Sequence, residues 1–249
     1  MSLRPASALG EENGDPGCGR EQNIFIARYG LPETPLIEYE GPFDMSLSGD
    51  GEKAAKELGQ HLKDTATVKH IFCSPFRRSL QTAIIASKVM EVSKVQVENG
   101  LTEWQTESLI GKEDPYKPPG IIDLVEEFGG VVNTKYESIA EPKPFESEEE
   151  MIARTGRVAK ILAESVYPAD ILIISHAPCL LGISLTLEGT FFNRGGTQLK
   201  PWPLGGLTRF RRVSRDKESA WRMEVSGSTA HMSGIYQDGK QAWTLPCLQ

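Results

Sequence analysis

Five residues with side chains suited to binding or transferring an anionic group stand where short apolar runs of the chain end. They are Arg28, Tyr29, Arg78, Glu103 and His176. Guanidinium groups bind oxyanions through two parallel N–H donors and keep their charge at every physiological pH. A histidine and a carboxyl group can hold or transfer a proton beside such an anion. These residue types together indicate a site for a ligand such as a phosphate group.

The elements that would bring these residues together alternate between apolar runs and segments of helical periodicity. Strands are expected at 24–28, 69–73, 94–97 and 171–175, and helices at 48–63, 75–90, 147–166 and 178–187. Two alternating segments, 207–213 and 221–225, are expected to pair near one edge. This pattern predicts a three-layer α/β domain with a mostly parallel sheet. Ligands bind beyond the carboxyl ends of such strands, so the five residues are expected to converge on one pocket.

Composition limits the possible functions. The chain has 249 residues, of which 39% are hydrophobic, enough for a substantial core. Its formal net charge of −7 disfavours nucleic acid as a partner. The four cysteines and four histidines are scattered without metal-ligand spacing, so we expect no metal and no other cofactor. No apolar run has the length of a membrane span or the form of a secretory signal, and we therefore expect a cytoplasmic protein without membrane contact.

The chain is expected to form a single domain over residues 23–249, preceded by a flexible leader at 1–22. The leader is rich in Gly, Glu, Pro and Ser and poor in large apolar residues, so it cannot bury enough surface to offset the entropy of ordering. Residues 106–144 are rich in Pro, Gly and acidic residues, with a short amphipathic piece at 121–128. We expect this stretch to be an insertion that covers the pocket.

Five segments, in order along the chain, resemble motifs of the histidine phosphatase superfamily, which has the phosphoglycerate-mutase-like fold. They are Arg28-Tyr29-Gly30 in place of Arg-His-Gly, Leu47-Ser48 with Gly51 and Ala54, Ser74 to Ala83, Leu101 to Trp104, and Ile173 to Ala177. Any one match is weak, but five in sequence are a strong signal. Within the superfamily the chain looks most similar to the Sts (suppressor of T-cell receptor signalling) and insect ecdysteroid-phosphate phosphatases.

The resemblance implies a role for each site residue. Arg28 and Arg78 would bind phosphate oxygens, and His176 would donate a hydrogen bond to the phosphoryl group and stabilise the transition state. Glu103 would be the general acid that protonates the leaving alkoxide, although the nearby Glu107 could take this role instead. Tyr29 occupies the position of the nucleophilic histidine. A protein tyrosine phosphatase loop is excluded because Cys73 and Arg78 are separated by four residues where that loop needs five.

Tyr29 is the main departure from the family pattern. A phenol has a reference pKa of about 10, and its phosphoester would hydrolyse far more slowly than a phosphohistidine. Leu31 and Pro32 also stand where Sts-type sequences have charged residues. We therefore expect a phosphate-monoester-binding protein that is catalytically impaired, a pseudophosphatase whose partner is a phosphorylated small molecule or a phosphoprotein. The alternative is a slow but active phosphatase, in which His176 or an activated water replaces the nucleophile. Family analogy permits a homodimer.

Overall fold

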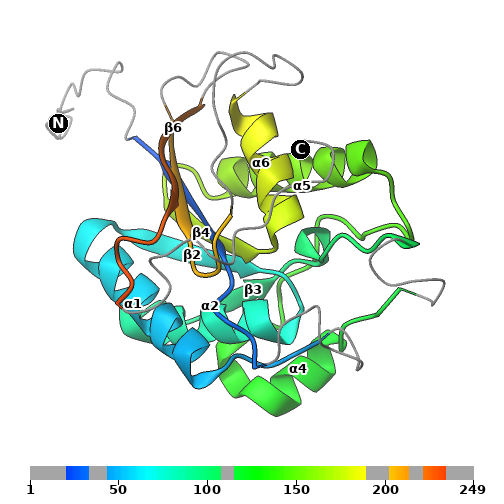
Figure 1. The fold of residues 1–249 in the computed structure, drawn as a ribbon, viewed down its shortest axis with the longest axis horizontal. Coiled ribbons are helices and arrows are strands. Elements are labelled where there is room, and N and C mark those ends of the chain that lie inside the picture. Colours follow the sequence, from blue (N-terminus) through cyan, green and yellow to red (C-terminus); the bar gives the residue numbers. More distant parts are fainter. Residues whose placement is uncertain (1–20, 34–43, 108–114, 189–201, 213–220, 234–249) are drawn as a thin grey trace, which may run out of the picture.

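The computed structural model describes residues 21–33, 44–107, 115–188, 202–212 and 221–233, which include one mixed sheet of six strands (Figure 1). The strands are β1 (Asn23–Arg28), β2 (Val68–Cys73), β3 (Val95–Val97), β4 (Asp170–Ser175), β5 (Leu207–Arg212) and β6 (Trp221–Ser228). Their order is β3-β2-β4-β1-β5-β6, with parallel pairing from β3 to β1 and antiparallel pairing of β5 and β6. The predicted α/β class and the predicted pairing at one edge are confirmed.

Helices cover both faces of this sheet, which gives the three layers that the sequence predicts (Figure 1). They are α1 (Gly49–Thr65), α2 (Arg77–Met90), α4 (Ile121–Phe128), α5 (Glu148–Ser165) and α6 (Ala177–Glu188). The helix α1 begins where the Ser48 hydroxyl accepts a hydrogen bond from the Gly51 amide at 3.1 Å, an N-cap. The helix α2 begins at Arg77, two residues later than Pro75, because Phe76 is still extended at its N-cap position.

Alternating residues of the central strands belong to two separate apolar clusters. Phe25 and Ala27 of β1 pack with residues of α1 and α2, whereas Ile24 and Ile26 pack with residues of α5 and α6. A strand buried on both faces reads as a continuous apolar run, which is why β1 and β4 were recognisable in the sequence. The ends of these two strands are therefore held firmly in register, Arg28 opposite Ser175.

A buried carboxylate fastens part of the predicted insertion to the end of β3. Glu98 is fully buried and accepts hydrogen bonds from the Tyr136 hydroxyl and from the amides of Ile139 and Ala140, at 2.5, 2.9 and 3.3 Å. Buried charges persist only where donors surround them, so this carboxylate fixes the position of the segment after α4. The helix α4 coincides with the predicted amphipathic piece at 121–128.

The predicted leader and the predicted insertion are described only in part. Residues 1–20 and 108–114 lie outside the described residues. Gln22, at the end of the predicted leader, is buried, and its side-chain amide donates to the carbonyls of Ala163 and Ala169 at 2.8 and 2.9 Å. No helix in the described part of the chain has the length and apolarity needed to cross a membrane.

Candidate functional site

The five residues singled out in the sequence lie at the carboxyl edge of the parallel strands and are all buried. Arg28 ends β1 and Tyr29 follows it, Arg78 is in the first turn of α2, Glu103 lies beyond β3, and His176 follows β4. Their exposed fractions are 7%, 1%, 0%, 9% and 0%, in that order. The alternative acid Glu107 is exposed, so Glu103 is the carboxylate that reaches this cluster.

Tyr29 lies among the three groups that would bind phosphate. The guanidinium carbon of Arg78 lies 4.7 Å from the centre of its ring, and that of Arg28 lies 5.5 Å away. The His176 ring meets it edge-on, with centres 5.3 Å apart. Cations at these distances are attracted by the negative face of an aromatic ring. The phenol ring therefore provides a partner for both guanidinium groups in the absence of an anion.

Glu103, Arg78 and His176 form a second set of contacts around one carboxylate oxygen. Oε2 of Glu103 lies 2.8 Å from Nδ1 of His176 and 3.3 Å from Nη2 of Arg78. An ionised carboxylate can only accept hydrogen bonds, so we assign the imidazole proton to Nδ1. Nε2 then accepts a hydrogen bond from the Ser74 hydroxyl at 2.9 Å. This second contact fixes the orientation of the imidazole.

Burial and the neighbouring charges set the protonation states. Burial lowers the pKa of His176 to about 4, with the charges of Arg78 and Arg28 acting in the same direction, so the imidazole is neutral at pH 7. Burial raises the pKa of Glu103, but His176 and the two guanidinium groups outweigh it and bring the value to about 2. Glu103 is therefore ionised, and without a ligand it has no proton to donate.

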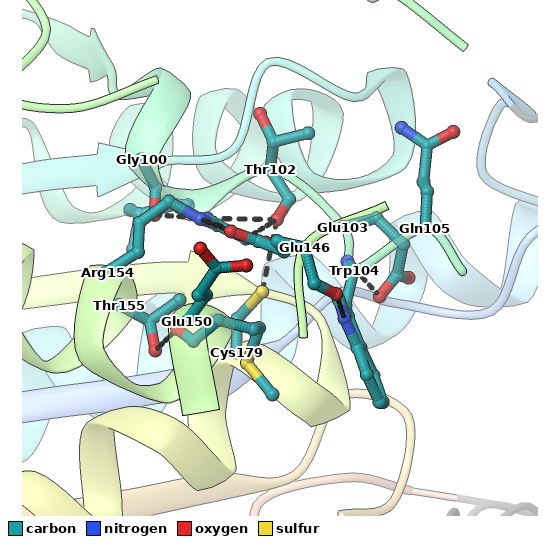
Figure 2. Close-up of polar contacts among 12 residues, drawn as sticks. Gly100, Thr102, Glu103, Trp104, Gln105, Glu146, Glu150, Arg154, Thr155 and Cys179 are labelled. Atoms are coloured by element: carbon teal, nitrogen blue, oxygen red, sulfur yellow. Dashed lines mark hydrogen bonds and ion pairs between the residues drawn. The ribbon is translucent and has the colours of Figure 1, made fainter. Parts of the chain in front are cut away.

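The backbone that carries Glu103 is held by side chains from three other elements, and Figure 2 shows two of them, Arg154 and Cys179. Arg154 of α5 donates to the carbonyls of Gly100 and Thr102 at 2.7 and 3.3 Å, and Cys179 of α6 donates to the Thr102 carbonyl at 3.2 Å. Ser175, at the end of β4, donates to the Leu101 carbonyl at 2.7 Å. These contacts fix the chain on the N-terminal side of Glu103.

A buried ion pair completes this support. The guanidinium of Arg154 is paired with the Glu146 carboxylate, and both side chains are at most 6% exposed. The Glu146 carbonyl in turn accepts a hydrogen bond from the Trp104 indole at 2.9 Å. Because Trp104 follows Glu103 directly, the pair holds the backbone on both sides of the candidate acid.

Tyr116, in the predicted insertion, contacts residues beside this cluster. Its hydroxyl donates to Asp44 at 3.1 Å, and its ring packs on Phe76 with centres 5.5 Å apart. Phe76 in turn lies 5.2 Å from the His176 ring and under the Arg78 guanidinium. Gln105 pairs with both backbone groups of Tyr116, at 2.8 and 2.9 Å. These contacts place Tyr116 and Phe76 beside the buried arginine and histidine of the cluster.

Three residues of this region were missed or given no role by the sequence argument. Asp44 accepts a hydrogen bond from the Arg77 amide at 2.5 Å, at the start of α2, where a negative charge is favourable. No local pattern marks Asp44 or Tyr116, because they meet only in the folded chain. Ser74 belongs to a matched motif, and that motif was the available signal for its contact with His176.

The loop after Tyr29 packs directly on the backbone of α1. A Cβ atom at Gly30 would lie 2.5 Å from the Gly51 carbonyl oxygen, and one at Gly51 would lie 2.1 Å from the Leu31 carbonyl oxygen. No side chain fits at either position, so both glycines are required by this close approach. The Gly30 amide also donates to the Thr82 hydroxyl of α2 at 3.1 Å. The backbone at Tyr29 is therefore held between two helices.

A reactive cysteine and a metal site are the two other kinds of chemistry to consider among the described residues. Cys73 is fully buried, and burial raises the pKa of its thiol, as expected for a packing residue. Within the described ranges, no three residues of the types His, Cys, Asp and Glu are grouped so that they could hold a metal ion.

A cavity of about 600 Å³ opens beside Glu103. Its lining comes from the end of β3 and the following residues, from 115–121 with Leu124, and from 136–146. Arg28, Tyr29, Arg78 and His176 are not part of that lining. Glu103 thus separates a closed cluster of positive charge from an open cavity.

The sequence profile of the histidine phosphatase superfamily (branch 1) matches residues 24–197, well over half of the chain. The chain belongs to the histidine phosphatase superfamily. The matched range contains all five site residues. Among curated proteins, none matches this histidine phosphatase homologue by sequence.

Several solved structures share its fold at low sequence identity. The ecdysone phosphate phosphatase of Bombix mori, solved with tungstate, has a TM-score of 0.65 at 15% identity over 86% of this chain and 96% of its own. A mycobacterial glucosyl-3-phosphoglycerate phosphatase has a TM-score of 0.58 at 16% identity, over 84% of this chain and 100% of its own. A phosphoserine phosphatase mutant of Entamoeba histolytica, solved with phosphoserine, has a TM-score of 0.54 at 19% identity, over 85% of this chain and 100% of its own. These similarities show a phosphoglycerate-mutase-like fold.

Proposed function

We propose that this protein binds phosphate monoesters at Arg28, Arg78 and His176, and that Tyr29 impairs their hydrolysis. The observation that carries the proposal is the position of the Tyr29 ring, 4.7 Å from one guanidinium, 5.5 Å from the other and 5.3 Å from the His176 ring. A nucleophile in this family must attack phosphorus held by these same groups. The Tyr29 side chain lies where such a nucleophile would have to lie, but its reactive group is a phenol and the family's is an imidazole.

An entering phosphate would exchange partners with groups of the protein. The Arg78 guanidinium faces the Glu103 carboxylate at 3.3 Å, so a phosphate that takes over this guanidinium replaces one anion by another. The displaced carboxylate would then lie beside a negatively charged phosphate, which favours its protonation. Glu103 would in this way acquire the proton that a general acid needs, although it is ionised in the ligand-free protein.

A slow phosphatase is the second candidate, and the contact between Glu103 and His176 at 2.8 Å favours it. All catalytic groups except the nucleophile are then in place, and oriented donors alone retain some acceleration over water. The same proposal includes membership of the Sts and ecdysteroid-phosphate branch. It also includes a ligand that is either a phosphorylated small molecule or a phosphoprotein, and a homodimer as a permitted assembly. The ecdysone phosphate phosphatase was solved with tungstate, which makes this ion a suitable probe.

Anion binding can be tested by the thermal stability of the protein in tungstate and in phosphate. A ligand at a hundred times its Kd stabilises the folded state by about 2.7 kcal/mol. We expect a rise in Tm for the wild type and its loss in Arg28→Met and Arg78→Met, each compared with its own ligand-free Tm. Arg77→Met is the matched control, because Arg77 is bound to Asp44 and Glu127 outside the cluster and should keep the full shift. A wild-type Tm that stays constant up to high anion concentration would refute the proposal.

A further inference from the structure

We propose that the cavity beside Glu103 receives the organic group of the phosphate monoester, and that this group carries no negative charge, is largely apolar and is at least as large as a fused pair of aromatic rings. The inference rests on the proposed function, because it assumes that the phosphate lies at Arg28 and Arg78. It adds the class of ligand, which neither the family nor the arginines determine.

The position of Glu103 connects the two sites. Its Oε2 atom faces Arg78 and His176, while the residue also lines the cavity. The ester oxygen that joins a phosphate to its organic group must lie beside the acid that would protonate it. With the phosphate at the arginines and that oxygen beside Glu103, the next atoms of the ligand enter the cavity.

The size of the cavity argues for a large organic group. Its volume of about 600 Å³ lies within the usual range of small-molecule sites, about 300–1,000 Å³. The organic part of an amino-acid phosphate would leave most of this space to water. A group that fills the cavity would gain from burying its apolar surface in proportion to its area.

The walls are mostly apolar. Prolines at 115, 118, 119, 142 and 144 contribute to them, together with Tyr136, Leu124 and Ile121. Proline has no backbone N–H, so these stretches present fewer donors to a ligand than ordinary loops do. Aromatic and proline surfaces of this kind suit flat or polycyclic groups better than a peptide or a sugar, which need many hydrogen bonds.

One hydroxyl in the lining has no partner. Thr102 is 1% exposed, and its Oγ1 atom makes no hydrogen bond within the described part of the chain. The carbonyl of the same residue accepts hydrogen bonds from Arg154 and Cys179, as Figure 2 shows. The backbone at Thr102 is therefore fixed and cannot carry the hydroxyl to another partner. A buried hydroxyl without a partner is costly, and a hydroxyl or carbonyl on the ligand would remove that cost.

The charges around the cavity argue against a second anionic group on the ligand. Glu103 is paired with Arg78, Glu146 with Arg154, and Lys143 with Glu150. The remaining charged residues of the lining are Lys117, Glu137 and Glu141, two carboxylates against one ammonium. Among the described residues of the lining, no cluster of cations is present to hold a carboxylate or a second phosphate. The organic group therefore carries no negative charge.

Two neighbouring isoleucines of α4 provide a matched pair of variants. Ile121 is 38% exposed and lines the cavity, whereas Ile122 is 72% exposed and does not. Ile121→Trp narrows the cavity, and Ile122→Trp adds the same bulk to the solvent side of the same helix. Both positions are exposed enough for the variants to fold, which circular dichroism would verify.

The experiment measures the affinities of tungstate, phosphoserine, 2-naphthyl phosphate and 2-naphthol by calorimetry. We expect the wild type to bind 2-naphthyl phosphate at least about tenfold more tightly than phosphoserine, about 1.4 kcal/mol. Ile121→Trp should abolish this preference and leave tungstate affinity unchanged, while Ile122→Trp should preserve it. Thr102→Val should weaken a naphthyl phosphate that bears a ring hydroxyl more than one without it.

The outcomes separate the two proposals. If tungstate binds but both esters bind equally in every variant, the inference about the cavity is overturned and the phosphate site stands. If none of the anions binds, the proposed function is overturned. In that case 2-naphthol binding that Ile121→Trp weakens still supports an apolar ligand site in the cavity, and its absence overturns the inference as well.

Discussion

The strand-end cluster and the segment from residue 115 to residue 146 are built in different ways. Four of the five residues of the cluster are placed by the end of a strand or the start of a helix, and the strands are fixed by parallel pairing in the sheet, whereas Glu103 depends on the side chains that hold its backbone. The segment is placed by contacts between side chains and backbone from distant parts of the chain, above all those of Glu98 and Gln105. Regular structure therefore positions the charges, and irregular structure determines what can reach them.

The difference shows which changes each region can tolerate. A side chain in the cluster can be replaced while its backbone stays in the sheet, as Tyr29 illustrates. A side chain such as Glu98 in the second region holds several backbone groups at once, so its replacement would move the whole segment. Substitutions in the cluster should therefore alter ligand binding or catalysis. Substitutions around the segment should alter the stability of the fold and the access of a ligand to the cluster.

The largest effect is expected from Tyr29→His. The substitution returns a nucleophile to a site that still has Arg28, Arg78, Glu103 and His176, and we expect phosphatase activity on an aryl phosphate to rise by about two to four decades. Adding His176→Ala to the variant should remove the gain. If the wild type already turns over at about 1–1,000 s⁻¹, the range of ordinary enzymes, Tyr29 is not a block to catalysis.

Breaking the ion pair between Arg154 and Glu146 tests the support of the second region. Arg154→Met leaves the buried Glu146 carboxylate without its cation, and we expect a loss of about 3–5 kcal/mol in unfolding free energy, measured by urea denaturation. Lys143→Met is the control, since it removes only an exposed pair with Glu150, which water screens, and its loss should be much smaller. Equal losses in the two variants would show that Arg154 is not buried with Glu146.

The pH dependence of stability reports on the cluster. The pKa of His176 is lowered to about 4 from its ordinary value of 6.5, so the folded state binds the proton less well than the unfolded state. The neutral imidazole therefore contributes its full stability above about pH 6.5, and this contribution falls away as pH decreases toward 4. A shift of this size corresponds to at most about 3 kcal/mol. Urea denaturation of His176→Gln should show a shallower decline between pH 6.5 and 4 than the wild type, and parallel curves would contradict the assignment.

Removing single hydroxyl groups from the second region should have the smallest effects. Tyr136→Phe takes a donor from the fully buried Glu98 carboxylate, and we expect a loss of about 1–3 kcal/mol. Tyr116→Phe removes the bond to Asp44, which keeps its contacts with Arg77, and should cost about 1 kcal/mol. Thermal unfolding of the two variants would show which hydroxyl group contributes more to stability. A larger loss of stability in Tyr116→Phe than in Tyr136→Phe would reverse our ranking.

The sequence predicted the parts of the molecule in which local pattern and tertiary structure agree. The apolar runs of β1 and β4 are buried on both faces, and the polar residues after them had to meet at one edge of the sheet. The contact of Tyr116 with Asp44 could not be predicted, because it joins residues far apart in the chain with no periodic signal. The protonation of Glu103 was equally out of reach, since it depends on burial, on the hydrogen bond from His176 and on the charges of two guanidinium groups.

The close contact of Gly30 and Gly51 bears on whether the loss of a nucleophile can be reversed. A loop that had loosened after the histidine disappeared would have to be rebuilt before any catalyst could work there again. Here the main chain at position 29 remains clamped between α1 and α2, because neither glycine can accept a side chain. A histidine introduced at position 29 would therefore meet a main chain that is already fixed, and the loop would need no rebuilding.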